Sequence, residues 1–170
     1  MRSIDGHPQG YEDDHGDTPP LVARAFKAFA ADPTADSAVL AALIGSRLLV
    51  PVVAVLGEVE YDEHGRARDK SSEMAAVLIQ RPDGQKALLA FTSMAAMAAW
   101  DPAARPVPVS CAQACESAIQ ESAVAVVVDI AGPQRFVIAG EDLRAAAAGH
   151  RLVGLEDGRW GWLTVAPDVE

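Results

Sequence analysis

The chain lacks a cysteine framework and a set of residues with metal-ligand spacing. Its two cysteines, Cys111 and Cys115, are spaced as on one helix face and not as in a Cys-x-x-Cys redox motif. A disulfide between them would close a very short loop, so we expect two small buried side chains. Three of the four histidines, His7, His15 and His64, lie in polar segments. We therefore expect no metal site and no cofactor.

Positive charge and long apolar runs are also scarce. The chain has 14 Lys and Arg against 24 Asp and Glu, a formal net charge of −10. Such a field repels nucleic acid and anionic lipid, so neither is an expected partner. The longest apolar stretches, 48–56 and 123–128, are far shorter than the ~20 residues of a membrane span. No apolar run of signal-peptide length follows Met1, and we expect a cytoplasmic protein.

Catalytic motifs are missing as well. The sequence has no Gly-x-Ser-x-Gly, no Walker loop and no His-Glu-x-x-His. Acid–base catalysis needs two titratable groups in a dry pocket, yet Asp129 is the only carboxylate within an apolar run. His150 follows a predicted helix end and has no obvious partner. An enzyme is the least favoured class.

What remains is enough for one domain, because half of the 170 residues are hydrophobic. Residues 1–18 are acidic and poor in apolar groups, which predicts a disordered tail outside the fold. Residues 19–149 are predicted to form a single domain, in which the polar segment 57–73 is a flexible loop or, alternatively, a partner-binding loop. Residues 150–170 form a C-terminal tail with a possible hairpin at Asp157-Gly158.

The order of helical and strand patterns predicts an α/β fold of the α+β kind. We expect a mixed, largely antiparallel sheet of about five to six strands with helices packed on it. The run 48–56 reads as a strand with Pro51 at an edge or near its start. The run 123–130 reads as a central strand. The predicted core comprises Leu40, Leu43, Val53, Leu78, Leu89, Phe91, Val126, Val128 and Phe136.

Two hairpins and two caps complete this pattern. Strand segments 74–80 and 86–91 flank an Asp-Gly turn, and 123–130 turns into 135–138 through Ala-Gly-Pro. Thr92 or Ser93 is placed to cap a helix that ends at Trp100. Ser110 and Gln113 have capping-box spacing at the start of another helix.

Several of these segments together resemble a known family. They are the helix and Leu-Leu-Val-Pro of 40–51, Phe-Thr-Ser of 91–93 with Trp100, Val-Pro-Val of 107–109, Val-Val-Val-Asp-Ile-Ala-Gly-Pro of 126–133, and Phe-Val-Ile of 136–138. Over residues 36–148 the chain resembles the N-terminal domain of SseB-family proteins, as found in many actinobacteria. The family usually has an acidic residue soon after the serine and an Asn in place of Asp129. The resemblance implies the fold and little about function.

Three residues are candidates for a small-metabolite pocket. Thr92, Ser93 and Asp129 should converge where strands 86–91 and 123–130 end. The alternative assigns them local roles, with capping by Thr92 and Ser93 and an Asx-type turn at Asp129.

The tail offers a second candidate, for partner binding. Trp160 and Trp162 would share one face of a strand. We expect a non-catalytic protein-interaction or regulatory domain, whose partner is another protein or a second copy of the chain. The small-metabolite pocket is the alternative function.

Overall fold

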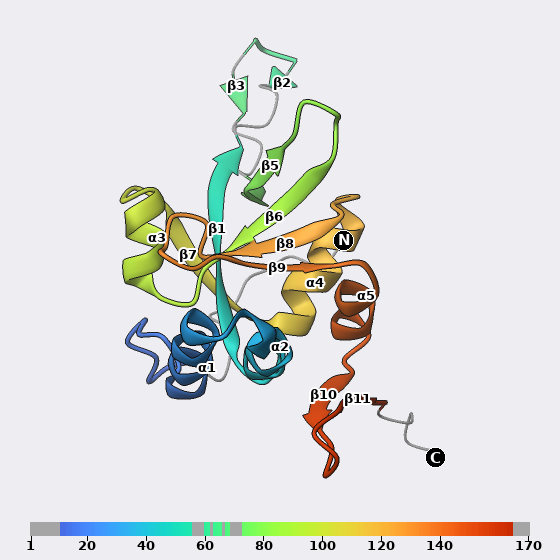
Figure 1. Cartoon of the computed structure of the whole chain (residues 1–170). Coiled ribbons are helices and arrows are strands. Elements are labelled where there is room, and N and C mark those ends of the chain that lie inside the picture. Colours follow the sequence, from blue (N-terminus) through green and yellow to red (C-terminus); the bar gives the residue numbers. More distant parts are fainter. Residues whose placement is uncertain (1–10, 56–59, 62, 66, 69–72, 165–170) are drawn as a thin grey trace.

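The computed structural model describes residues 11–55, 60–61, 63–65, 67–68 and 73–164 (Figure 1). Its helices are α1 (Pro20–Ala31), the 3-10 helix η1 (Pro33–Ala35), α2 (Asp36–Ile44), α3 (Met94–Trp100), α4 (Cys111–Gln120) and α5 (Gly140–Ala147). Its strands are β1 (Arg47–Val55), β2 (Glu60–Tyr61), β3 (Ala67–Arg68), β4 (Glu73–Ala76), β5 (Leu78–Gln80), β6 (Lys86–Ala90), β7 (Arg105–Ser110), β8 (Ala125–Val128), β9 (Phe136–Ala139), β10 (Arg151–Gly154) and β11 (Trp160–Leu163).

Two sheets form the centre of the molecule. One has the order β5-β6-β8-β9, with β6 and β8 parallel and the other pairs antiparallel. The other is antiparallel, with the order β4-β1-β7. They are joined where Leu49 and Phe91 exchange two backbone hydrogen bonds of 2.8 Å. The predicted α/β class with largely antiparallel strands is confirmed, and β8 is an inner strand as expected.

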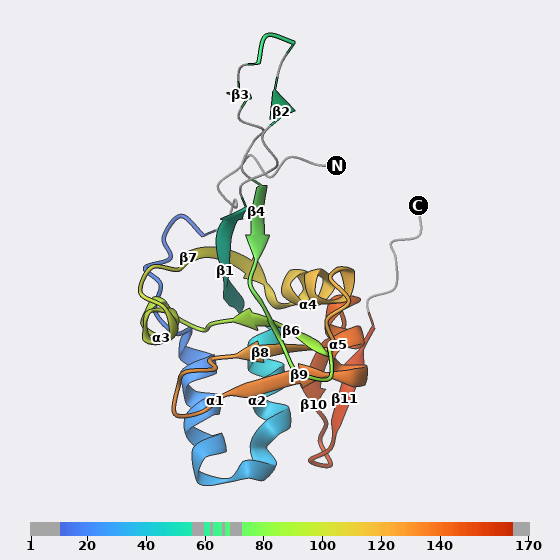
Figure 2. The same cartoon turned by 90° about the horizontal axis from the view of Figure 1, so that it is seen from above.

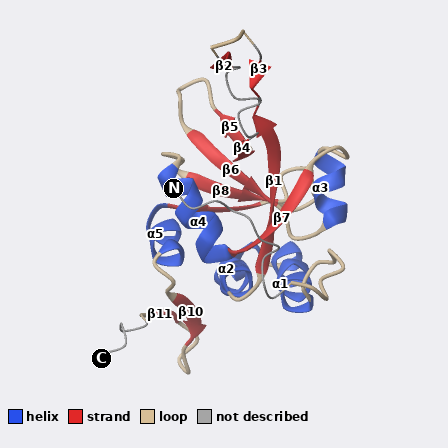
Figure 3. Ribbon diagram, turned by 180° about the vertical axis from the view of Figure 1, so that it is seen from behind, coloured by secondary structure: helices blue, strands red, loops and turns tan. Residues whose placement is uncertain are grey.

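The helices cover the two faces of the β5-β6-β8-β9 sheet unequally. Apolar side chains of α1, α2, α4 and α5 pack on one face around Leu88, Val126 and Ile138. On the other face α3 packs through Met97 near Phe91, at one end of the sheet. Figure 3 shows α3 on the far side of β1 and β7 from α4 and α5. None of the helices of the described residues covers the rest of that face.

Most of the predicted core is buried. Leu40, Leu43, Leu89, Phe91, Val126 and Val128 are buried, and Leu78 and Phe136 are half-buried against the core. Val53 is 50 % exposed, so its assignment to the core is wrong. The last pair between β1 and β7 is Val52–Arg105, and from Val53 onward β1 pairs only with β4. The apolar run continues beyond the part of the strand that is covered.

Pro51 lies in the middle strand of its sheet, so the expectation of an edge or strand-start position is wrong. Its pairing partner is another proline, Pro106 of β7. On the side of β1 that faces away from β7, the neighbour changes at Pro51. Leu49 pairs with Phe91 before it, and β4 pairs with β1 from Val52 onward. A missing N–H is tolerated at this junction because no continuous ladder needs it.

Two further segments differ from expectation, and a third is as predicted. Residues 11–18, expected to lie outside the fold, contact it through Asp14 and Gly16, whereas 1–10 lie outside the described residues. Within the segment 57–73, β2 and β3 pair with each other and project away from the two main sheets (Figure 2), and the flexibility expected of the rest lies outside the described residues. The predicted hairpin at Asp157-Gly158 is present as β10 and β11.

Candidate functional site

Thr92 lies where β6 ends and α3 begins, and it joins two distant parts of the chain. Its backbone N–H donates to Asp129 Oδ1 over 2.8 Å, and its hydroxyl donates to Asp129 Oδ2 over 2.7 Å. Its carbonyl oxygen accepts from Arg47 Nη1. The next residue, Ser93, caps α3 by accepting the Ala96 N–H over 3.0 Å. The structure thus brings Thr92, Ser93 and Asp129 together.

Asp129 does not make the expected Asx-type turn. It follows β8 in the left-handed region, with φ of 54°, which Asp tolerates better than most residues. The turn after it is closed by backbone alone, because the Gly132 N–H donates to the Asp129 carbonyl over 3.0 Å. The carboxylate is free of the turn and reaches the end of the parallel strand β6. It ties the ends of β6 and β8 together.

The Asp129 carboxylate is buried without a positive partner. The residue is 8 % exposed, and within the described part of the chain its two oxygens accept from Thr92 alone. Among the described residues no Lys, Arg or His side chain pairs with it. Burial raises the pKa of Asp129 above its ordinary value, and the Thr92 hydrogen bonds oppose that rise.

Arg47 is the buried cation of this region, and it holds the N-terminal residues against the domain. Its side chain is 7 % exposed and pairs with the Asp14 carboxylate through Nε and Nη2. Nη2 also donates to the Asp17 carbonyl, over 2.6 Å. The Met94 N–H donates to the Gly16 carbonyl over 2.8 Å. We call residues 11–18 the N-terminal strap.

The strap explains why composition misled the prediction for 11–18. Composition counts apolar groups, but this segment is held by polar contacts to one buried guanidinium. The hydrogen bonds from Arg47 also hold the pKa of Asp14 below its ordinary value. The sequence signal was the charge of Arg47 directly before the apolar run 48–56, because a charged residue at the end of a buried strand needs a partner.

A pocket of about 420 Å³ opens beside these residues. Its walls come from the strap, α1, α3 and the loop after β8. Most of the side chains are small, which leaves the space. The lining residues are Thr18, Ala23, Phe26, Thr92, Ser93, Ala95, Ala96, Ala99, Asp129, Ala131, Gly132, Pro133 and Gln134. We call this space the Asp129 pocket.

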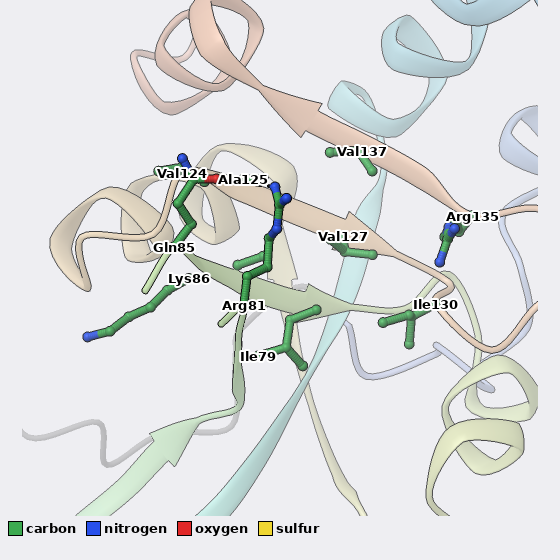
Figure 4. A pocket seen from close by; sticks show the side chains of 11 residues that line it. Ile79, Arg81, Gln85, Lys86, Val124, Ala125, Val127, Ile130, Arg135 and Val137 are labelled. Carbon is green, nitrogen blue, oxygen red and sulfur yellow. Dashed lines mark hydrogen bonds between the residues drawn. The ribbon is translucent and has the colours of Figure 1, made fainter. Parts of the chain in front are cut away.

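A second hollow, of about 490 Å³, lies on the uncovered part of the β5-β6-β8-β9 sheet. Figure 4 shows Ile79, Val127, Ile130 and Val137 on this side of the sheet. Alanines of β6 and β8 complete the floor, and Val137 is 50 % exposed. We call the surface formed by Ile79, Ala87, Ala125, Val127, Ile130 and Val137 the open sheet face.

The charged residues that line the hollow over the open sheet face are all basic. They are Arg81, Lys86 and Arg135, and none of the eleven residues that line the hollow is acidic. In Figure 4 Arg81 extends over the sheet, Arg135 lies at the opposite end and Lys86 points outward. Arg81 has a distant carboxylate, Asp83, at 3.8 Å, in an exposed pair that contributes little. This concentration of cations is unusual in a chain of net charge −10.

The two tail tryptophans have different surroundings. Trp162, on β11, is half-buried and packs against the main core, and its partner across the hairpin is Leu152. Trp160 is 41 % exposed, and its ring lies beside Gly154. The packing of Trp162 joins the hairpin to the main core, although the sequence placed it in a C-terminal tail beyond residue 149.

The cysteines lie on the inner face of α4 and are free thiols in the main core. A hydrogen bond with Cys115, together with burial, raises the pKa of Cys111 well above its ordinary value, which disfavours the thiolate form that reacts. Within the described residues no group of three or more His, Cys, Asp or Glu is placed to hold a metal ion. No described helix is long and apolar enough to cross a membrane.

Fold and surfaces together define an α+β domain in which the hollow on the open sheet face and the Asp129 pocket are separate. The family described as the SseB protein N-terminal domain matches residues 22–145. This match spans more than half of the chain, and the chain belongs to that family. No curated protein and no solved structure matches the chain. The match ends before β10, so the hairpin lies outside the matched region although it packs on the core.

Proposed function

We propose that this chain is a non-catalytic protein-interaction domain whose docking surface is the open sheet face. The observation that carries the proposal is an apolar sheet surface with a hollow of about 490 Å³ and only basic charges around it. Two apolar side chains that line this hollow, Val124 and Val137, are 48 % and 50 % exposed, and apolar side chains exposed around a hollow favour a binding partner. Here α3 covers one end and leaves the remainder open.

The chemistry of the surface selects the occupant. An apolar floor favours a partner segment with aliphatic or aromatic side chains, and the cations favour Asp or Glu at its margins. We therefore propose an acidic, apolar segment of another protein as the partner. The role in the cell is regulatory or adaptor-like, because the domain supplies a surface and no reactive constellation.

Two other occupants fit less well. A second copy docked face to face would bring the cations of both copies together with no carboxylate lining either surface. Nucleic acid would meet three cations on a chain of net charge −10, and no aromatic side chain lines the face for base stacking. We place the protein in the cytoplasm, which suits two separate thiols in one core.

A random peptide library selected on the whole chain tests the proposal. We expect recovered peptides to combine Asp or Glu with large apolar residues and to shift the NMR methyl signals of Val127, Ile130 and Val137. Val137→Glu should abolish their binding, and the fold should tolerate it because Val137 is half exposed. Arg135→Glu should weaken binding, whereas Arg24→Glu, which changes an exposed cation of α1, should not.

Three results would overturn the proposal. The first is a set of peptides rich in Lys and Arg. The second is equal binding of the selected peptides to the Val137→Glu variant. The third is a concentration-dependent dimer in sedimentation equilibrium that Val137→Glu dissociates, which would assign the open sheet face to a second copy.

A further inference from the structure

The Asp129 pocket is separate from the open sheet face and has the dimensions of a small-molecule site. Its volume of about 420 Å³ falls in the range of ligand pockets, roughly 300–1,000 Å³. Alanines of α1, of α3 and of the loop after β8 create the space, and Phe26 and Pro133 add larger apolar surfaces. Two of the walls are joined to each other by the Gln134 side-chain amide. In the orientation that satisfies both of its groups, the amide NH2 donates to the Phe26 carbonyl of α1 and the amide oxygen accepts from the Ala30 N–H.

One charge faces this apolar space. Among the described residues, Asp129 is the only ionisable one that lines the pocket. Its carboxylate is held in place by two hydrogen bonds from Thr92, both from uncharged donors. Each oxygen keeps a further acceptor site, because an ionised carboxylate accepts about four hydrogen bonds. The group is oriented, buried and without a counter-ion among the described residues.

The contrast with Arg47 makes this absence informative. The two buried charges lie on opposite sides of the same residue, Thr92. Arg47 has its carboxylate in Asp14, as buried charges generally do. Asp129 has none, and it also adopts a left-handed backbone, a feature that concentrates at ligand sites. A carboxylate needed only to hold Thr92 could be an asparagine, whose amide oxygen would accept the Thr92 N–H and whose amide NH2 would donate to the Thr92 hydroxyl oxygen.

We propose that the Asp129 pocket binds a small organic cation, an ammonium group on a short apolar frame. The ammonium pairs with the free acceptor sites of Asp129, and the frame lies among the alanines. The Phe26 ring suits the same ligand, because aromatic faces attract cations. An anionic ligand is disfavoured because the pocket offers no cation and one carboxylate. The net charge of −10 further favours the approach of a cation.

Three matched probes test this ligand class on the whole chain. The probes are n-pentylammonium, 1-pentanol and pentanoate, which share one apolar frame and differ in charge. Binding is followed by NMR through the backbone amides of Thr92, Ser93 and Ala96. We expect n-pentylammonium to bind at least about tenfold more tightly than 1-pentanol, as a charged hydrogen bond requires. Pentanoate should leave these amides unshifted.

Variants separate the charge from the space. Asp129→Asn should remove the preference for n-pentylammonium over 1-pentanol, a result that a purely structural role of Asp129 would not produce. Ala99→Leu fills the pocket from an exposed position of α3, so it should weaken both probes without unfolding the domain. Ala98→Leu is the matched control, because Ala98 is also exposed on α3 and does not line the pocket.

The proposal is overturned if n-pentylammonium leaves the pocket amides unshifted. Equal affinities for n-pentylammonium and 1-pentanol would overturn it too, as would an unchanged preference in the folded Asp129→Asn variant. Should Ala98→Leu weaken binding as much as Ala99→Leu, the ligand binds elsewhere on α3 and the assignment to the pocket is wrong.

Discussion

Replacing Asp14 with Ala should destabilise the whole domain, although Asp14 lies in a segment whose composition predicts disorder. The substitution removes the carboxylate that pairs with two nitrogens of Arg47. It leaves a guanidinium whose side chain is 7 % exposed with only the carbonyl oxygens of Thr92 and Asp17 as partners. A buried cation without its counter-ion is costly.

The magnitude follows from burial. Breaking a fully buried ion pair costs about 3–5 kcal/mol. The Asp14 side chain is 21 % exposed, so water can reach the guanidinium once the strap moves away, and we expect about 2–3 kcal/mol. This is a large share of a typical domain stability of about 5–15 kcal/mol. Asp13→Ala is the control, because Asp13 is an exposed neighbour and makes no hydrogen bond or ion pair within the described residues.

Urea unfolding of the two variants measures the effect. Hydrogen exchange of the Met94 amide reports strap release separately, because that amide donates to Gly16 of the strap. If Asp14→Ala unfolds within about 0.5 kcal/mol of Asp13→Ala, the ion pair does not hold the strap and the reasoning fails. Unchanged exchange at Met94 in a destabilised variant would also contradict it.

The same pair gives a signed pH dependence. The pKa of Asp14 is lower in the folded chain than its ordinary value of 3.8. The unfolded state therefore binds the proton more readily, and the stabilisation is fully present above pH 3.8. It is lost as the pH falls through the folded-state pKa. The stability difference between the wild type and Asp14→Ala should shrink over that acid range.

Two further predictions concern Asp129 and the C-terminal hairpin. Asp129→Asn should leave the free energy of unfolding at neutral pH unchanged or raised, because the pKa of Asp129 is raised by burial and its ionised form is disfavoured in the fold. The wild type should therefore gain relative to Asp129→Asn as the pH falls through the folded-state pKa of Asp129, and urea curves showing the reverse order would contradict this. Trp162→Ala should cost about 2 kcal/mol, since half-burial halves the cost of a core Trp, whereas Trp160→Ala should change stability by less than about 0.5 kcal/mol. Equal losses in thermal or urea unfolding would show that Trp162 does not anchor the hairpin.

Local signals in the sequence were sufficient for several of the helices and hairpins. The Asp-Gly turns predicted the β5–β6 and β10–β11 hairpins, and the Ser110–Gln113 capping box is present at α4. The run that became β8 is an inner strand because it is apolar on both faces. Each of these features depends on neighbours within a few residues, so composition and spacing determine them.

Features that depend on distant partners were not predictable in the same way. Arg47 and Asp14 are 33 residues apart, and a single pair of charges leaves no periodicity in the sequence. The convergence of Thr92 and Asp129 was predicted, because both follow strands expected to be adjacent. The hydrogen bonds that the Asp129 carboxylate accepts from Thr92 were not predicted. Asp129 has a backbone φ of 54°, and its carboxylate bonds to Thr92 and not within its own turn. The assignment of Val53 to the core was wrong because the exposure of its side chain depends on which strands lie beside β1.

Thr92 connects the two buried charges, and this connection links strap closure to the Asp129 pocket. Its carbonyl accepts from Arg47, while its N–H and hydroxyl donate to Asp129. Thr18 of the strap lines the same pocket, and its hydroxyl lies 3.4 Å from that of Thr92. Release of the strap therefore removes Thr18 from the wall of the pocket and from beside the Thr92 hydroxyl that donates to Asp129. A ligand that binds only the closed pocket must in turn favour strap closure by the same free energy, because binding and closure are thermodynamically linked.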